Sequence, residues 1–201
     1  MPRDSDLKSQ LECELVTTPE RSQSAYSIRP AQLCDAPDIA HVHIESWQST
    51  YTGIFPKAVL SGLSLEKRTE AWRGLLATPR PDAVTLVACN STGTIVGFLD
   101  GGKELTGQLQ CDSELYGIYL LPGAQRQGVG TLLVGAFVRE MRRRGYASMV
   151  VWVLDLNPSK KFYEALGGSV ITQKSIERGG LRYLEIAFGW RELHALPRSD
   201  Q

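Results

Sequence analysis

A glycine-rich loop joins an apolar, strand-like run to a long amphipathic helix, and this junction constrains the fold more than any other feature of the chain. The segment reads LLPGAQRQGVGTLL over residues 120–133, with Gly128 and Gly130 at the mouth of a predicted helix, 129–145. The first N–H groups of a helix have no partners within it and carry about half a positive charge. Glycines at this place let an anion approach the backbone, so the loop predicts a phosphate or pyrophosphate cradle.

Two common nucleotide-binding loops do not match this segment. A Walker loop requires Lys and then Ser or Thr directly after its last glycine, whereas Thr131 and Leu132 follow Gly130. A Rossmann fingerprint requires a small residue three positions after the second glycine, where this chain has Leu133. The loop therefore predicts phosphate binding of another kind, and a tight turn without a ligand is the alternative.

The order of the predicted elements describes a single mixed α/β domain at residues 25–190. Residues 1–24 are polar and aperiodic, which predicts a flexible extension, and 191–201 form a C-terminal tail. Asp35 and Ser64 are the expected N-caps of the first two helices. The expected elements are strands at 25–31, 84–90, 94–101, 114–121 and 148–157, helices at 35–51, 64–77, 129–145 and 159–168, and a final hairpin.

Composition excludes several classes of function. Lys plus Arg and Asp plus Glu both number 22, which argues against nucleic acid or an anionic membrane surface as the main partner. No apolar run approaches the roughly 20 residues that span a bilayer, and the N-terminus lacks the apolar core of a signal peptide. We expect a cytoplasmic protein without a metal, because its widely spaced cysteines fit no ligand pattern: Cys13, Cys34, Cys89 and Cys111.

The loop and a second motif together resemble the GCN5-related N-acetyltransferase (GNAT) superfamily. Q-R-Q-G-V-G at 125–130 matches the motif Q/R-x-x-G-x-G/A of that superfamily. Asn157 and the following residues resemble N-x-x-x-x-x-Y-E-x-x-G-F, with Gly168 in place of the usual phenylalanine. The resemblance covers about residues 25–190. It implies a central, mostly antiparallel sheet that splays apart between its fourth and fifth strands and is flanked by helices.

Acetyl-CoA is the co-substrate that this resemblance implies. Its pyrophosphate would bind the glycine loop, and its pantetheine arm would lie between the splayed strands, where backbone groups need partners. The amide of Leu120 would polarise the thioester carbonyl, and Lys160 is equally compatible with a solvated face. The implied coenzyme contacts are Tyr119, Leu120, Leu121, Gln125, Arg126, Gln127, Gly128, Val129, Gly130, Thr131, Asn157, Ser159 and Lys160.

The resemblance also implies direct attack of a primary amine on the thioester in a ternary complex. The amine is mostly protonated at neutral pH, so a base or a chain of waters has to remove a proton. Glu114 matches the glutamate that histone-type members use through water, and a solvated strand-end carboxylate is the alternative. Strict alternation would put Glu114 and Leu120 on one face of their strand. Tyr163 matches the tyrosine that protonates the leaving thiolate, and a buried helix residue is the alternative.

The acceptor is expected to contact the first helix. Trp47, Gln48 and Tyr51, followed by Gly53, resemble a W-x-x-x-Y-x-G signature of one bacterial branch of the superfamily, and an aromatic core pair is the alternative. The acceptor itself stays open between a small-molecule and a peptide amine, and the oligomeric state between a monomer and a homodimer. A non-catalytic acyl-CoA sensor of the same fold and a nucleotide-binding protein of another fold are the competing interpretations.

Overall fold

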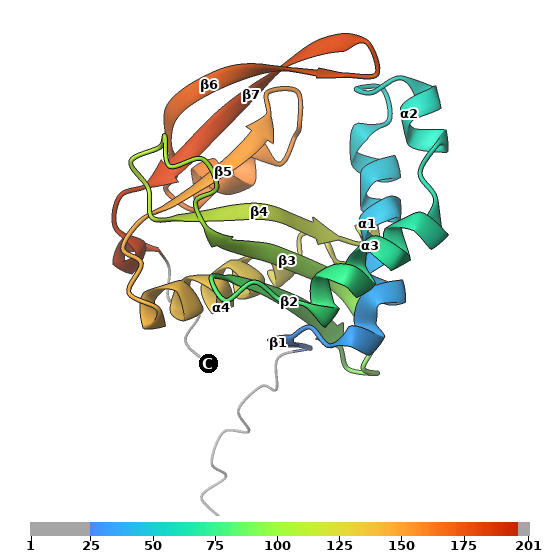
Figure 1. Ribbon diagram of the computed structural model, residues 1–201, viewed down its shortest axis with the longest axis horizontal. Helices are drawn as coiled ribbons and strands as arrows, with labels where there is room; N and C mark the ends of the chain where they lie inside the picture. The colour runs from blue at the N-terminus through green and yellow to red at the C-terminus, as the bar shows by residue number, and fades with distance from the viewer. Residues whose placement is uncertain (1–24, 197–201) are drawn as a thin grey trace, which may run out of the picture.

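Seven strands form one sheet in the order β1-β2-β3-β4-β5-β7-β6, as a computed structural model of the chain shows (Figure 1). The structure describes residues 25–196. The strands are β1 (Tyr26–Pro30), β2 (Ala83–Asn90), β3 (Ile95–Lys103), β4 (Ser113–Leu120), β5 (Met149–Leu154), β6 (Ser169–Arg178) and β7 (Leu181–Trp190). The α-helices are α1 (Ala36–Tyr51), α2 (Lys57–Ser61), α3 (Leu65–Ala77), α4 (Val129–Arg143) and α5 (Lys160–Ala165). Short 3₁₀ turns lie at Leu33–Asp35, Pro122–Ala124 and Leu193–Ala195.

Helices cover both faces of the first half of the sheet. The amphipathic helix α4 packs on one face through residues such as Leu133 and Phe137, which join Leu99 of β3 in the larger core cluster. Helices α1 and α3 pack against each other and cover the opposite face, where Trp72 meets Phe98. The expected mixed α/β architecture with a mostly antiparallel sheet is confirmed.

Strands β4 and β5 run parallel and separate after a short stretch of pairing. They pair only where Ser113–Leu115 faces Met149–Val151. Farther along, β4 continues to pair with β3 as far as Leu120, and β5 pairs with β7 as far as Leu154. The two strands therefore diverge toward their C-terminal ends, which confirms the predicted splay between the fourth and fifth strands.

A β-bulge in β4 changes which side chains share a face. Leu115 pairs with Gly101 and Gly117 pairs with Asp100, so Tyr116 is an extra residue in the register. Leu115 and Leu120 consequently both pack into the cluster on the α4 side. Glu114 precedes Leu115 and lies on the opposite face. The expectation that Glu114 and Leu120 share a face is therefore wrong, because strict alternation does not hold across a bulge.

The N-caps of the first helices agree only in part with those predicted from the sequence. Ser64 caps α3 as expected, since its hydroxyl accepts from the Lys67 N–H at 3.2 Å. Asp35 stands at the N-cap position of α1, but its carboxylate binds Arg29 and does not cap the helix. Helix α2 was not expected from the sequence, because its five residues are too few to show a helical period.

Other expectations concern the termini and the cysteines. The N-terminal extension 1–24, which includes Cys13, and residues 197–201 of the tail lie outside the described residues. Within residues 25–196, Cys34, Cys89 and Cys111 are free thiols. None of the helices described there is long and apolar enough to cross a membrane.

Candidate active site

A cleft of about 770 Å³ lies where β4 and β5 separate. Its walls come from α1, the diverging parts of β4 and β5, the start of α4, the segment from Asn157 through α5, and the β6–β7 hairpin. It brings together many of the predicted site residues: Trp47, Tyr51, Glu114, Tyr119, Leu120, Gln125, Arg126, Gly130, Asn157, Ser159 and Tyr163. Segments more than 100 residues apart in the sequence thus meet in one site.

The loop before α4 holds its backbone in an open, concave shape. Gly128 is the N-cap of α4 with a φ of 80°, and Arg126 is also left-handed with a φ of 62°. Such left-handed turns beside a helix N-terminus point backbone N–H groups into a concave surface that suits an anion. A Cβ on Gly128 would meet no atom within 4 Å, so the space in front of this residue is open. The geometry fits a pyrophosphate cradle.

The side chain of Gln127 stabilises the loop through hydrogen bonds to other parts of the protein. It accepts a hydrogen bond from the Tyr26 hydroxyl at 2.6 Å and donates one to the carbonyl of Gly123 at 2.5 Å. Val129 is fully buried in the core cluster on the α4 side. The side chains of these two residues are thus engaged within the protein, and their backbone groups remain as the candidates for anion contact.

The end of β4 points backbone groups toward the gap. The Leu121 N–H donates to the carbonyl of Val96 in β3 at 2.9 Å. Because backbone groups of successive residues point to alternate sides of a strand, those of Leu120 face away from β3 and toward β5. The Leu120 carbonyl accordingly accepts from the Ser46 hydroxyl at 2.9 Å and from the Gln125 amide at 3.2 Å. Its N–H faces the same gap.

Asn157 joins the two sides of the cleft. It is buried, and its Nδ2 donates to the Tyr51 hydroxyl at 3.2 Å, while its Oδ1 accepts from the Ser159 N–H at 2.8 Å. These bonds fix the turn into α5 against the end of α1. The neighbouring Lys160 is bound to Asp155 at 2.6 Å, so its ammonium already has a partner.

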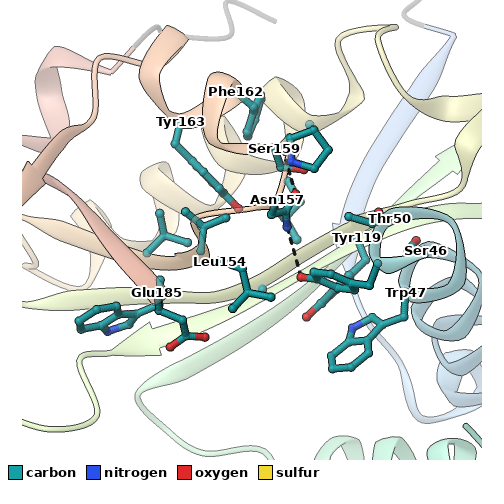
Figure 2. A pocket seen from close by; sticks show the side chains of 18 of the residues that line it. Ser46, Trp47, Thr50, Tyr119, Leu154, Asn157, Ser159, Phe162, Tyr163 and Glu185 are labelled. Carbon is teal, nitrogen blue, oxygen red and sulfur yellow. Dashed lines mark hydrogen bonds between the residues drawn. The ribbon is translucent and has the colours of Figure 1, made fainter. Parts of the chain in front are cut away.

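Tyr163 extends from α5 toward Asn157 along the wall of the cleft (Figure 2). The residue is only 5% exposed, and its ring packs against Phe162 and Phe188. Burial raises the pKa of its phenol well above the ordinary value, and the neighbouring Tyr119 and Tyr51 add to the shift. The side chain therefore remains protonated at neutral pH.

Glu114 lies deeper in the cleft, beside the point where β4 and β5 begin to separate. Its carboxylate accepts from the Leu105 N–H at 3.3 Å. Burial raises its pKa, the bond from Leu105 lowers it, and the nearby Glu104 raises it further. A buried carboxylate with a raised pKa takes up a proton more readily than a solvated one.

An aromatic cluster of α1 and the following loop forms the far end of the cleft. Tyr51 packs at ring-centroid distances of 5.1 Å from Trp47 and 4.8 Å from Phe55. Trp47 and Tyr51 thus belong to a core cluster and also line the cleft. Gln48 is exposed on the next face of α1 and does not line the cleft, whereas Ser46 and Thr50 do.

Sequence reasoning missed the contribution of the C-terminal hairpin. Lys174, Ile176 and Arg178 alternate along β6 and line the cleft together with Glu185 of β7. Their period of two was visible in the sequence, but nothing local indicated which sheet face lay next to α1. Among residues 25–196 no group of three or more His, Cys, Asp or Glu side chains is arranged to hold a metal ion.

Packing explains why the chain has Gly168 where the family motif usually has phenylalanine. A Cβ at this position would lie 2.7 Å from the indole ring of Trp190 and 2.9 Å from the carbonyl of Tyr163. Trp190 is buried, and its indole N–H donates to the carbonyl of Leu166 at 2.9 Å. Trp190 of β7 therefore occupies the space beside α5, and a larger residue at position 168 would collide with it.

Comparisons with known proteins agree on one family. Residues 101–176 match the model of the FR47-like protein family. YuaI of Bacillus subtilis (strain 168), named as an uncharacterized N-acetyltransferase, is 36% identical over 170 residues, which cover 85% of this chain and 95% of that relative. The chain belongs to the GCN5-related N-acetyltransferase superfamily. The predicted family and enzyme class are thereby confirmed, and a nucleotide-binding protein of another fold is excluded.

Solved structures of lower identity share the fold. The PaiA N-acetyltransferase of Thermoplasma acidophilum, solved in complex with coenzyme A, has a TM-score of 0.66 at 22% identity, covering 81% of this chain and 97% of that one. The ribosomal-protein-S18-alanine N-acetyltransferase of Escherichia coli has a TM-score of 0.56 at 21% identity, covering 82% and 92%.

Proposed function

We propose that the chain transfers an acetyl group from acetyl-CoA to a primary amine by direct attack in a ternary complex. The observation that carries this proposal is the cleft itself. It runs from an anion-binding helix mouth, past the free backbone edge of β4, to a buried tyrosine and a buried glutamate. The coenzyme A bound to the fold relative from Thermoplasma acidophilum supports the same assignment.

The chain holds the coenzyme by its backbone more than by its side chains. The N–H groups around Gly128 bind the pyrophosphate, with Arg126 beside them at the cleft. The acetyl-CoA supplies an activated thioester. The Leu120 N–H, which faces the gap, donates to the thioester carbonyl and stabilises the negative charge that forms there during attack. Asn157 orients the pantetheine arm and the start of α5.

Glu114 takes the proton of the incoming amine through water. An alkyl ammonium with a pKa of about 10.4 is neutral in about one part in 2,500 at pH 7, a free-energy penalty of about 4.6 kcal/mol. A carboxylate whose pKa is raised by burial is a better base than a solvated glutamate, so it can take up this proton as the amine attacks. The bulge puts Glu114 on the face of β4 that α1 covers, which is also the side of the acceptor residues Trp47 and Tyr51.

Tyr163 donates the proton that the leaving thiolate takes up. A thiolate has an ordinary pKa of about 8.5, and the same desolvation that raises the pKa of the phenol raises that of a thiolate formed beside it. The phenol is protonated before the reaction and regains its proton from solvent afterwards.

The test is an assay of free thiol and acetylated product with acetyl-CoA and a panel of amines. We expect turnover with at least one amine, and Tyr163→Phe should lower kcat by about 100-fold while leaving coenzyme affinity within about threefold. The matched control is Tyr146→Phe, since Tyr146 lies outside the cleft, between α4 and β5. Coenzyme binding without turnover on any amine would contradict the proposal and indicate an acyl-CoA sensor.

A further inference from the structure

Building on the proposed acetyltransferase function, we infer that the acceptor is a small amine that also carries a carboxylate, and that Arg178 of β6 binds this carboxylate. Arg178 lines the cleft beside Trp47 and Phe55. It is a residue to which neither of the two sequence motifs assigns a role.

The position of Arg178 follows from the register of the hairpin. Lys174 of β6 stands opposite Glu185 of β7, Ile176 stands opposite Tyr183, and Arg178 stands opposite Leu181 at the end of the strand. Side chains at every second position share a face, so Lys174, Ile176 and Arg178 all face α1 across the cleft. Arg182 of β7 stands opposite Glu177 and does not line the cleft.

The guanidinium of Arg178 is held by aromatic rings. Its central carbon lies 5.3 Å from the centre of the Trp47 ring and 5.8 Å from that of Phe55. No carboxylate of the described residues 25–196 forms an ion pair with it within 4.0 Å. A guanidinium that is held through its aromatic contacts keeps N–H donors for a planar anion, and a carboxylate accepts two of them at once.

The other cation on this face of the hairpin, Lys174, already has a partner within the protein. Lys174 forms an ion pair with Glu185 at 3.4 Å and lies 3.9 Å from the centre of the Trp152 ring. Its charge is therefore balanced within the protein. Of Lys174 and Arg178, the two cations of β6 that line the cleft, Arg178 therefore remains available to bind a ligand.

Arg178 and Glu185, which carry opposite charges, line the cleft together with Tyr51. Burial is the main cause that raises the pKa of the Tyr51 phenol, while the charge of Arg178 opposes the shift and that of Glu185 adds to it. The cleft lining thus includes a group of each charge, of which Glu185 is paired with Lys174 and Arg178 has no ion-pair partner among residues 25–196. Figure 2 shows Glu185 extending into the cleft from the β7 side. A carboxylate on the acceptor would pair with Arg178, whereas a polyamine presents only cations to it.

The hairpin also limits the size of the acceptor. The Tyr183 hydroxyl donates to the carbonyl of Ile54 at 3.1 Å, and a Cβ on Gly179 at the hairpin turn would lie 2.6 Å from Val59 of α2. The tip of the β6–β7 hairpin thus packs on the α1–α2 segment, and Figure 1 shows it beside α2 at the upper edge of the molecule. Because this hairpin and α1 both line the cleft, their contact bridges the cleft on this side. A bridged cleft favours a small molecule over a protein segment.

The experiment compares acceptors that differ only in the carboxylate. Glycine, β-alanine, γ-aminobutyrate and a set of α-amino acids are each assayed beside their primary amides, together with spermidine and a short peptide. We expect the carboxylate form to be preferred by at least tenfold in kcat/KM in one of these pairs. Arg178→Gln should reduce that preference by at least tenfold, through KM, because a charge-assisted bidentate contact is lost.

Two further variants separate the contact from a general effect on the fold. Arg178→Lys keeps the charge and loses the planar fork, so it should restore only part of the preference. Arg182→Gln on the same hairpin should leave the preference within about twofold. An equal or better rate with the amides, with spermidine or with the peptide would overturn the inference while leaving acetyl transfer intact. Acetyl-CoA binding without acetylation of any amine would overturn the acetyltransferase function as well.

Discussion

Glu114 and Tyr163 are both buried in the cleft, and burial acts on their chemistry in complementary ways. It favours the neutral form of each, so the glutamate becomes a stronger base and the tyrosine keeps its proton, as their proposed roles require. Their surroundings also differ. Glu114 has a backbone donor at Leu105, whereas the ring of Tyr163 is enclosed by aromatic residues.

The proposed role of Glu114 as the base predicts a characteristic pH dependence of the reaction. Glu114→Gln should lower kcat/KM at pH 7 by about 100-fold, and the defect should shrink as the pH approaches the amine pKa of about 10.4, where solvent deprotonates the amine. In the unmodified protein the rate should rise through a pKa above that of a free glutamate, because burial raises the pKa of Glu114. Profiles of kcat/KM between about pH 6 and pH 10 measure both effects.

The control for this profile is Glu177→Gln, which changes an exposed carboxylate outside the cleft. It should reproduce the unmodified profile. A Glu114→Gln variant whose defect is constant over the whole pH range would argue that waters alone remove the proton.

The β6–β7 hairpin is the element that closes the acceptor end, and its turn contains two adjacent glycines with different surroundings. Gly179 and Gly180 both have positive φ, 61° and 77°. A Cβ on Gly179 would collide with Val59, but one on Gly180 would meet nothing within 4 Å. Substitutions at these two positions therefore distinguish the effect of packing at the turn from the effect of its backbone strain.

We therefore expect Gly179→Ala to displace the hairpin tip from α2 and to raise the KM for the acceptor by about fivefold or more. Gly180→Ala carries a similar backbone penalty of about 1 kcal/mol and should leave this KM within about twofold. Acetyl-CoA affinity, measured by calorimetry, should be the same in both variants, since the neighbours of a Cβ on Gly179 are Val59 and Pro56 and not the glycine loop. Equal acceptor KM values for the two variants would show that the contact with Val59 does not shape the site.

At the scale of the whole molecule, an ion pair ties the first strand to the first helix. The Asp35 carboxylate accepts two bonds from the Arg29 guanidinium, at 2.6 and 2.9 Å, and one from the Gln32 N–H at 2.7 Å. Asp35 is 5% exposed, whereas the Arg29 side chain is 38% exposed. The bond with Arg29 is the main cause that holds the pKa of Asp35 below its ordinary value, against the opposing effect of burial.

A lowered pKa in the folded state makes stability depend on pH. The contribution of Asp35 is present above its unfolded pKa of about 3.9 and is lost as the pH falls through its lower folded pKa. Asp35→Asn should lower the free energy of unfolding by about 1–2 kcal/mol at pH 7, a range reduced for the solvent exposure of Arg29. The difference should narrow near pH 3, as urea unfolding at the two pH values measures.

Asp38→Asn is the matched control, because Asp38 is an exposed carboxylate in the first turn of the same helix. Its effect should be a few tenths of a kcal/mol at pH 7. An Asp35→Asn variant that is destabilised equally at both pH values would contradict the proposed linkage.

The elements that the sequence predicted well were those with a clear period or a clear end. The apolar run of β5 and the amphipathic pattern of α4 were both visible, and Ser64 marked the start of α3. Helix α2 escaped prediction because it is short, and the β4 bulge because it interrupts a regular alternation. Gly117 next to the bulge was a local signal for it, since a glycine inside a strand often marks such an irregularity.

The sequence by itself determined the family and the glycine loop before α4, because each depends on residues within a short stretch of chain. The glycine conformation at position 128 and the spacing from Asn157 to Tyr163 are local properties. Only the tertiary structure decided that Glu114 lies on the face of β4 opposite Leu120 and that Arg178 lies over Trp47. The reason is physical: these placements depend on a bulge in strand pairing and on packing between segments about 130 residues apart, which no local pattern encodes.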